Sequence, residues 1–189
     1  MKGFTDTFVI WIFIIIFLIV LFFLYNQLED NTYVHLDENA PMPTELNPIV
    51  EEKKNALIEK ASDNNIKVFI TEEIRSFEAQ NQLYEQGRNN RGNIVTNARA
   101  GESYHNYGLA IDYALENDIG EIIWDIHYDG NDNGEPDWFE VADIAKDLGF
   151  EWGGDWRNFK DYPHLQMTFG LSIRQLQNGI RPRHHEPEA

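Results

Sequence analysis

The chain has 189 residues, a formal net charge of −17 and no cysteine. The charge excludes nucleic acid as the main partner, because phosphate binding requires basic surfaces, and it argues against docking on anionic lipid. Without cysteine, an extracytoplasmic domain must be held together by packing, and a zinc site must use His, Asp or Glu. The length allows one membrane segment and one domain of about 150 residues.

The first predicted element is a membrane anchor. Phe8 to Tyr25 is a run of eighteen residues without a charged side chain, long enough to span a bilayer as a helix. A cleaved signal peptide is the alternative, but its apolar region should be shorter and should end in small residues. Lys2 precedes the run, whereas Glu29 and Asp30 follow it, so we expect the N-terminus in the cytoplasm and the domain outside.

The remaining chain divides into three parts. Residues 26–46 are polar and contain Pro41 and Pro43, so they are predicted to form a linker after the anchor at residues 1–25. Residues 47–180 are predicted to form the folded domain. Residues 181–189 are rich in proline and charge and are expected to be a flexible tail.

Helices and short strands are interspersed in the predicted domain. Asn47 and Pro48 are a typical cap and first residue of a helix, and Ser76 is a second N-cap. Apolar periodicity predicts helices over residues 48–62, 77–87, 137–148 and 171–178. Alternating and β-branched residues predict strands over residues 66–71, 107–114, 121–126 and 165–169.

Two short motifs bring together groups that can bind a metal. Ser103 to Asp112 reads S-x-H-x-x-G-x-A-x-D, and Asp161 stands three residues before His164. His105 precedes a predicted strand, Asp112 lies within it and His164 opens another strand, so the three can converge. Two His and one Asp are a plausible ligand set for a catalytic zinc, with the fourth position left to water. Asp161 would then be the general base.

Two further residues are candidates for the same site. Arg75 lies at a strand-to-helix junction, from which it could polarise a scissile carbonyl or hold its developing oxyanion. A surface arginine paired with a neighbouring glutamate is an equally good interpretation. Ser103 is a candidate for hydrogen bonding to a substrate carboxylate or to a metal ligand.

A separate loop has the sequence pattern of a calcium site. The stretch from Asp129 to Glu140 matches D-x-[DN]-x-[DN]-G-x5-E, which places oxygen ligands at Asp129, Asn131, Asn133 and Glu140 around a turn at Gly134. The preceding segment is predicted to be a strand, so this is not a standard EF-hand. We expect a structural or regulatory calcium site; the alternative is an acidic hairpin loop that binds nothing.

Together the motifs resemble those of the zinc D-Ala-D-Ala carboxypeptidase and L-alanyl-D-glutamate endopeptidase family of peptidoglycan hydrolases. The likeness covers about residues 42–169 and is greatest for the endopeptidase branch. It implies a hedgehog-like α+β domain with a small central antiparallel sheet and flanking helices, here preceded by one transmembrane helix. It also implies that His105, Asp112 and His164 bind zinc, that Asp161 is the catalytic acid/base and that Arg75 stabilises the carbonyl oxygen.

The expected function is therefore zinc-dependent hydrolysis of the L-alanyl-D-glutamate bond in peptidoglycan stem peptides. The expected location is the cell membrane, with the domain facing the cell wall, or outside the cell if the N-terminal segment is cleaved. Three alternatives remain: a D-Ala-D-Ala carboxypeptidase on the same site, a non-catalytic wall-binding module, and a calcium-dependent adhesion module. The presence of Asp161 and Arg75 favours an enzyme.

Overall fold

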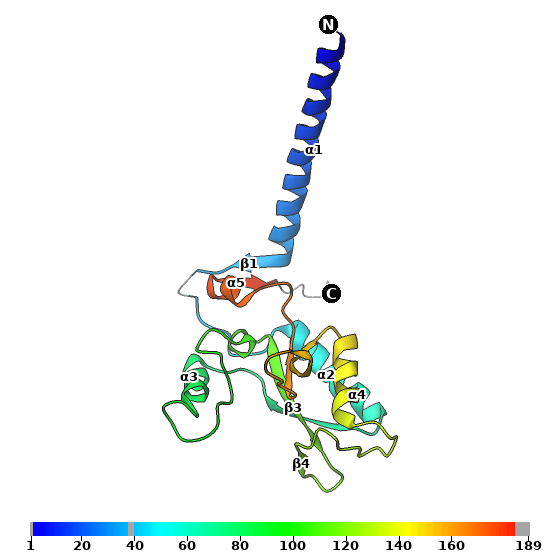
Figure 1. Ribbon diagram of the computed structural model, residues 1–189, viewed down its shortest axis with the longest axis vertical. Helices are drawn as coiled ribbons and strands as arrows, with labels where there is room; N and C mark the ends of the chain where they lie inside the picture. The colour runs from blue at the N-terminus through cyan, green and yellow to red at the C-terminus, as the bar shows by residue number, and fades with distance from the viewer. Residues whose placement is uncertain (1, 38–39, 184–189) are drawn as a thin grey trace.

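The computed structural model describes residues 2–37 and 40–183, except for the side chains of residues 2–9, 26 and 28–31. Figure 1 shows one long helix, α1 (Lys2–Thr32), leading into a folded domain. None of the helices, as far as the chain is described, combines the length and apolar character that crossing a bilayer requires. The transmembrane helix expected over Phe8 to Tyr25 is therefore not among the features that the structure shows.

The domain is built on a small antiparallel sheet. Its strands run in the order β2 (Lys67–Glu72), β3 (Ala110–Glu116), β6 (His164–Gln166) and β5 (Glu151–Trp152). A short strand, β4 (Ile122–Ile123), also pairs with β3. β2 pairs with one edge of β3. β4 and β6 both pair with the other edge, where they lie end to end.

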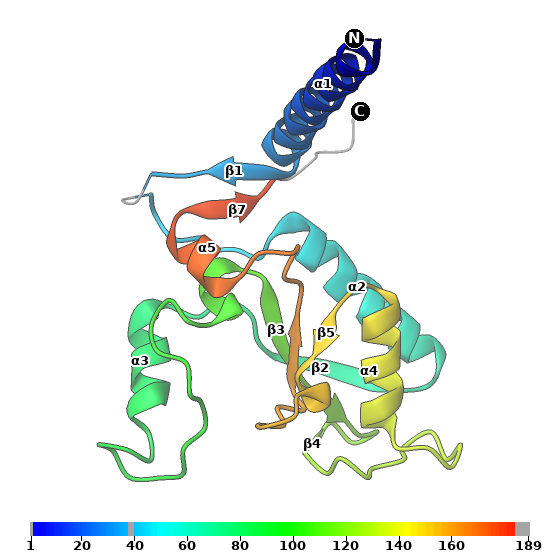
Figure 2. The same ribbon diagram turned by 45° about the horizontal axis from the view of Figure 1, so that its top comes forward.

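Helices cover the sheet on one side, as Figure 2 shows for α2 (Pro48–Asp63) and α4 (Asp137–Asp147). The start of α2 is as predicted, because the Asn47 side chain accepts a hydrogen bond from the Ile49 amide. Side chains alternate between the faces of a strand. Tyr113 and its neighbours two residues away join the helix-facing core, and Asp112 points to the opposite face. The α+β prediction with a small antiparallel sheet is confirmed.

The segment that leads to β3 differs from the prediction. After α3 (Phe77–Glu85), which Ser76 caps as predicted, a loop reaches a 3-10 helix, η1 (Tyr104–Tyr107). The predicted strand over 107–114 begins only at Ala110, because Gly108 adopts a φ of +68° and ends η1. The predicted strand over 121–126 is limited to β4. The strand over 165–169 shifts to β6, and a second 3-10 turn, η2 (Gly153–Asp155), follows β5.

The strand that follows α1 pairs with a strand near the C-terminal end of the described chain. β1 (Tyr33–His35) is antiparallel to β7 (Ile180–Pro182), which follows α5 (Ile173–Gln177). Two residues of the tail expected from residue 181 thus lie in β7, where strand pairing holds them; residues 184–189 lie outside the described part. The linker expected over 26–46 likewise contains the end of α1 and β1, and its residues 38 and 39 are not described.

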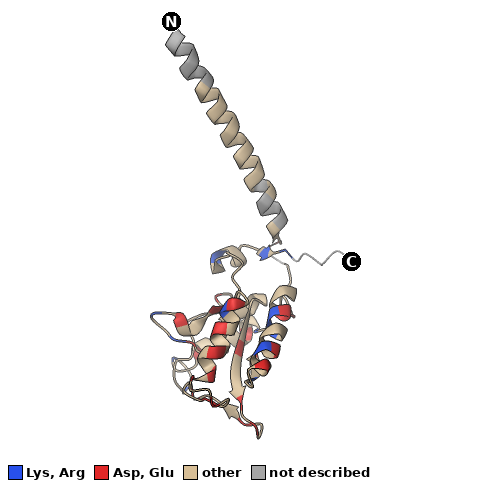
Figure 3. Ribbon diagram, turned by 90° about the vertical axis from the view of Figure 1, so that its right-hand side faces the viewer, with Lys and Arg blue, Asp and Glu red and all other residues tan. Residues whose placement is uncertain are grey.

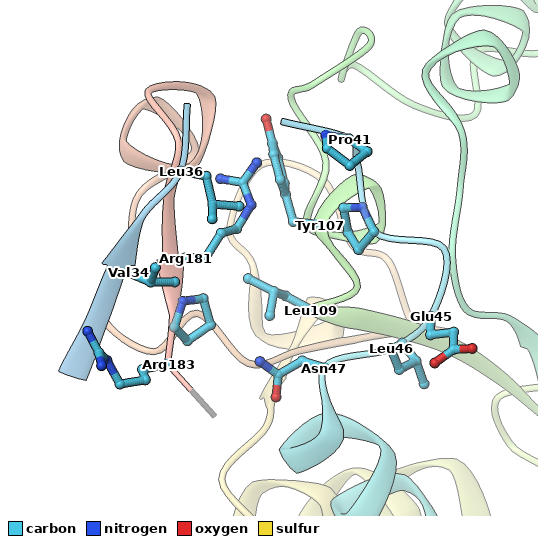
Figure 4. Close-up of a pocket in the computed structure, with 12 residues that line it drawn as sticks. Val34, Leu36, Pro41, Glu45, Leu46, Asn47, Tyr107, Leu109, Arg181 and Arg183 are labelled. Carbon is cyan, nitrogen blue, oxygen red and sulfur yellow. The ribbon is translucent and has the colours of Figure 1, made fainter. Parts of the chain in front are cut away.

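An apolar cavity of about 490 Å³ separates this two-stranded ribbon from the domain. Figure 4 shows Arg181 beside the ring of Tyr107, with its guanidinium carbon 4.6 Å from the ring centroid. None of the residues predicted to bind zinc or to act in catalysis lines this cavity. Asp and Glu are spread over the helices and loops of the domain (Figure 3).

Candidate metal centre

The three predicted zinc ligands meet on the open face of the sheet. His105 comes from η1, Asp112 from β3 and His164 from β6, where it is the direct cross-strand partner of Asp112. The His105 Nε2 atom lies 3.1 Å from Asp112 Oδ1 and 3.2 Å from His164 Nδ1. His164 Nδ1 lies 3.2 Å from the same Asp112 oxygen. The three atoms form a nearly equilateral triangle.

The outer hydrogen bonds decide which ring nitrogens carry protons. His105 Nδ1 lies 2.7 Å from the Glu73 carbonyl, which can only accept, so this nitrogen is the donor. His164 Nε2 lies 3.0 Å from Gln166 Oε1 and donates to it. The two inward nitrogens therefore present lone pairs to each other and to the Asp112 carboxylate. Three acceptors at this distance are suited to a shared cation.

The donor set fits zinc. Ligand atoms about 2.0–2.1 Å from a tetrahedral zinc lie roughly 3.3 Å from each other, close to the 3.1–3.2 Å found here. His105 is 1% exposed and His164 is 6% exposed, so packing holds both rings. Together these three residues are also a group whose donor atoms all lie within 4.8 Å of one another. The arrangement leaves a fourth side for water or substrate.

Gln166 is a supporting residue that sequence reasoning missed. Its Nε2 donates to Glu151 at 2.9 Å, and the other Glu151 oxygen accepts from Thr168 Oγ1 at 2.9 Å. This chain of bonds fixes the Gln166 carboxamide so that its oxygen faces His164. Such outer partners orient the ring and increase its basicity toward a metal. The available signal was the spacing of two residues in a strand, which places Gln166 on the same face as His164.

Arg75 is buried and reaches the site from the loop after β2. Its Nε and Nη2 form a two-pronged ion pair with Glu72, at 2.7 and 2.5 Å. Its Nη1 donates to Gln80 at 3.0 Å, and Nη2 also lies 3.3 Å from Asp112 Oδ2. Arg75 pairs with a neighbouring glutamate, as one sequence interpretation expected, but its side chain is buried rather than on the surface. It also contacts a predicted ligand. Sequence reasoning missed Gln80 as a further partner.

Asp161 lies beside the ligands in a tight loop. Its backbone amide donates to the Gly153 carbonyl at 3.1 Å, and its own carbonyl accepts from the His164 amide at 3.3 Å. Burial raises the pKa of Asp161 above its ordinary value, and the charge of Asp112 adds to this shift.

The ligands open into a cavity of about 630 Å³. Its wall includes the predicted catalytic residues Arg75 and Asp161, and it also includes Ser103, which is half-buried. Leu83 and the loop over residues 95–98 form another part of the wall. Three aromatic side chains contribute as well: Trp124, Trp156 and Phe159. The cavity therefore combines a metal-binding group with apolar surface suited to an organic substrate.

The predicted calcium ligands also converge. The two Asp129 carboxylate oxygens accept from the Asn133 and Gly134 amides at 3.1 and 2.9 Å. The side-chain amides of Asn131 and Asn133 donate to the two oxygens of Glu140 at 3.2 and 2.8 Å. Gly134 has a φ of +93°, as the sharp turn at the sixth loop position requires. The segment from Trp124 to Tyr128 is a turn rather than the predicted strand.

Sequence comparisons with known proteins find a matching family model and two relatives. A peptidase M15 family model described as D-alanyl-D-alanine carboxypeptidase matches residues 96–167, which include both His-Asp motifs. The chain is 57% identical over 153 residues to the peptidoglycan L-alanyl-D-glutamate endopeptidase CwlK of Bacillus subtilis, covering 81% of this chain and 91% of that protein. It is 33% identical over 114 residues to the L-alanyl-D-glutamate peptidase of Listeria phage A118, covering 60% of this chain and 34% of that protein.

Two solved structures are also similar. The L-Ala D-Glu endopeptidase ChiX of Serratia marcescens matches with a TM-score of 0.47 at 22% identity, covering 70% of this chain and 84% of that one. The L,D-carboxypeptidase DacB of Streptococcus pneumoniae matches with a TM-score of 0.47 at 22% identity, covering 76% of this chain and 81% of that one.

Proposed function

Because the chain belongs to the peptidase M15 family of D-alanyl-D-alanine carboxypeptidases and L-alanyl-D-glutamate endopeptidases, we propose that it hydrolyses the L-alanyl-D-glutamate bond of peptidoglycan stem peptides with zinc. The observation that carries the proposal is the triangle of lone-pair donors from His105, Asp112 and His164 beside Asp161. The relative at 57% identity is named for this bond. Water adds across the amide, leaving a carboxylate on L-Ala and an amine on D-Glu.

Zinc held by this triangle would polarise the scissile carbonyl and lower the pKa of a bound water to about 7. Asp161 accepts the proton of the attacking water and passes it to the leaving amine. Its raised pKa suits this role, because the carboxyl group must carry the proton between the two steps. The backbone bonds to Gly153 and His164 hold Asp161 in place beside the ligands.

Arg75 has a double role in this proposal. Four of its five N–H groups are engaged by Glu72, Gln80 and Asp112, so its first task is to orient the Asp112 carboxylate. Because Arg75 lines the cavity, the remaining Nη1–H is assigned to the substrate carbonyl oxygen, where charge develops in the transition state. Ser103 lines the same cavity and is assigned to hydrogen bonding with the substrate.

Mass spectrometry of purified peptidoglycan after digestion by the full chain tests the function. New L-Ala C-termini and D-Glu N-termini are expected, and they should be absent with Asp161→Asn or after chelation. Asp155→Asn is the matched control, because this exposed carboxylate lies in η2 outside the cavity wall. Loss of terminal D-Ala would instead identify a carboxypeptidase, and no cleavage by a zinc-loaded chain would support a wall-binding module.

We also propose that the N-terminal segment holds the domain at the cell membrane, facing the wall. The support is an uninterrupted run from Ile10 to Tyr25 of large apolar side chains that are each 40–67% exposed, more apolar surface than a monomeric soluble protein normally exposes. Membrane fractionation followed by alkaline extraction tests this location. The full chain should stay with the membrane, whereas Ile15→Asp combined with Leu18→Asp should release it. A wild-type chain recovered in the soluble fraction would contradict the proposal.

Calcium is proposed as a second cofactor, bound in the loop from Asp129 to Glu140. Asp137 adds support that the sequence pattern did not use. It is 2% exposed, and its Oδ2 accepts from the Gly130 amide at 3.1 Å. Its Oδ1 is buried and has no hydrogen-bond partner within the described chain. Burial raises the pKa of Asp137, and the charges of Glu140 and Asp129 act in the same direction.

A calcium ion would satisfy the unpaired Asp137 Oδ1 and offset the repulsion among the neighbouring carboxylates. An unsatisfied buried acceptor costs roughly 1–3 kcal/mol, and Asp137 occupies the ninth loop position, which supplies a calcium ligand directly or through water. Calcium would therefore bind Asp129, Asn131, Asn133, Asp137 and Glu140 at the start of α4. The site would stabilise the helix that packs against α2.

Terbium luminescence, sensitised by the adjacent Trp138 and competed by calcium, tests this site on the full chain. An affinity on the order of 10⁻⁴ M is expected, as for extracellular calcium modules. Asp129→Ala should abolish the calcium-competed signal. Glu135→Gln is the matched control, because it removes one charge from the loop at the position that contributes only its backbone carbonyl. Equal signals from both variants would refute the site.

A further inference from the structure

Trp124 is an exposed aromatic side chain in the wall of the zinc cavity. It is 57% exposed, and it lines the same cavity as His105, Asp112, Asp161 and His164. The mechanism proposed above gives it no task. Trp156, by contrast, packs its ring 5.2 Å from the His164 ring and so helps to hold a ligand. A large apolar ring left open beside a reactive site marks a place where a ligand docks.

The ring of Trp124 is firmly supported from behind. Its centroid lies 6.3 Å from that of Trp138, with the planes tilted by 34°, and Trp138 lies 4.9 Å from Tyr113. Trp138 is 1% exposed and Tyr113 is fully buried. Three aromatic rings thus lead from the core to the cavity. Contact with Trp138 holds the Trp124 ring in place, so that a ligand binding to its flat face pays a smaller entropic cost for immobilising the side chain.

The sheet fixes how far Trp124 lies from the zinc ligands. β4 and β6 lie end to end along the same edge of β3, with Ile123 opposite Leu115 and His164 opposite Asp112. Trp124 directly follows Ile123 and so comes level with the residue after Tyr113. Two residues of β3 therefore separate Trp124 from His164 along the strand. At about 3.4 Å per residue, the separation along the sheet is roughly 7 Å.

The proposed substrate has a sugar at a matching distance. In peptidoglycan, the amine of the scissile L-Ala is joined to the lactyl group of muramic acid. The L-alanyl and lactyl units are each about one residue long, so the sugar ring begins roughly 7 Å from the scissile carbonyl at about 3.3–3.6 Å per residue. A pyranose ring has a face of C–H groups that can pack on a flat aromatic surface.

We propose that Trp124 is a specificity-determining residue that stacks on the muramic acid ring, so that the enzyme prefers stem peptides still attached to the glycan. The inference rests on the proposed L-alanyl-D-glutamate cleavage and names the form of substrate that the site takes. Stem peptides already released from the sugar would lack this contact and would be cleaved less efficiently.

Two substrates that differ only in the sugar provide the test. One is the N-acetylmuramyl-linked stem peptide, and the other is the same peptide with N-acetyl-L-Ala, which keeps the amide but lacks the sugar. Trp124→Ala should lower kcat/KM roughly tenfold on the first substrate, the order of an aromatic stacking contact, and leave the second within about twofold. Trp124→Phe should recover part of the loss. Phe69→Ala, an exposed aromatic on β2 outside the cavity wall, is the matched control.

Equal losses on both substrates would overturn the proposal, because Trp124 would then contact the peptide. An unchanged kcat/KM on both substrates would also overturn it. A wild-type chain that cleaves neither substrate would refute the proposed function. The sugar contact is then decided by nuclear magnetic resonance, with N-acetylmuramyl-L-alanine as the probe and the Trp124 indole N–H signal assigned through Trp124→Phe. A shift of this signal supports the platform, and its absence refutes it.

Discussion

Replacing Gly153 by alanine should disable the site by displacing Asp161. A Cβ at position 153 would lie 2.4 Å from the Asp161 carbonyl oxygen and 3.0 Å from the Asp161 Cβ. Ordinary contact begins at 3.4 Å, so the carbonyl oxygen must retreat by about 1 Å. A displacement of about 1 Å in a catalytic group can cost roughly 100-fold in rate. We expect Gly153→Ala to lower kcat/KM on a stem peptide by about that factor.

The assay pairs kcat/KM with zinc content per chain and with the melting temperature. Overpacking typically costs about 1–3 kcal/mol, so a modest drop in melting temperature is also expected. Gly120→Ala is the control. Its Cβ would meet nothing within 4 Å, but its φ of +82° makes alanine strained. The control should therefore lose stability and keep its activity within about twofold. Wild-type activity in Gly153→Ala would refute the reasoning.

The remaining predictions concern the outer contacts and the fold. Gln166→Leu should weaken zinc binding about 10–100-fold, because His164 loses the acceptor that orients it; competition with a chelator measures this, and an unchanged affinity would contradict it. Arg75→Lys should lower kcat/KM at least tenfold, because a point charge cannot reproduce the paired bonds to Glu72. Steady-state kinetics on the stem peptide measures this, and full activity in the variant would contradict it. Asn47→Ala should cost about 1 kcal/mol of stability through loss of the α2 cap, with kcat/KM unchanged; a denaturant titration yielding no loss would count against the cap.

Local patterns predicted the elements whose cause is local. The Asn47 and Ser76 caps, the periodicity of α4 and the alternation in β2 lie within a few residues of the features they produce. The candidate ligands were also accessible to sequence reasoning, because His105 and Asp112 share one motif and His164 opens a strand. The structure then places all three within hydrogen-bond distance.

Long-range contacts could not be predicted in the same way. Nothing near Tyr33 indicates that β1 pairs with β7, which lies at the other end of the described chain. The partnership of Arg75 with Gln80 depends on where the start of α3 turns relative to β2. The contact of Gln166 with Glu151 depends on the pairing of β5 with β6. These features arise from strand order and helix placement, which residue spacing alone does not determine.

The loop from Asp129 to Glu140 combines a feature that sequence spacing predicted with one that it could not predict. Its spacing predicted four converging ligands, and the structure brings Asp129, Asn131, Asn133 and Glu140 together through hydrogen bonds. The buried, unpaired oxygen of Asp137 could not be read from the pattern, because its burial follows from the packing of α4.

X-ray diffraction from crystals of the full chain, recorded on both sides of the zinc absorption edge, tests the central claim most directly. One anomalous peak is predicted about 2.0–2.1 Å from His105 Nε2, His164 Nδ1 and the Asp112 carboxylate, with Asp161 facing its open side. A zinc peak elsewhere in the domain would contradict the account, as would binding through the nitrogen of His164 that donates to Gln166.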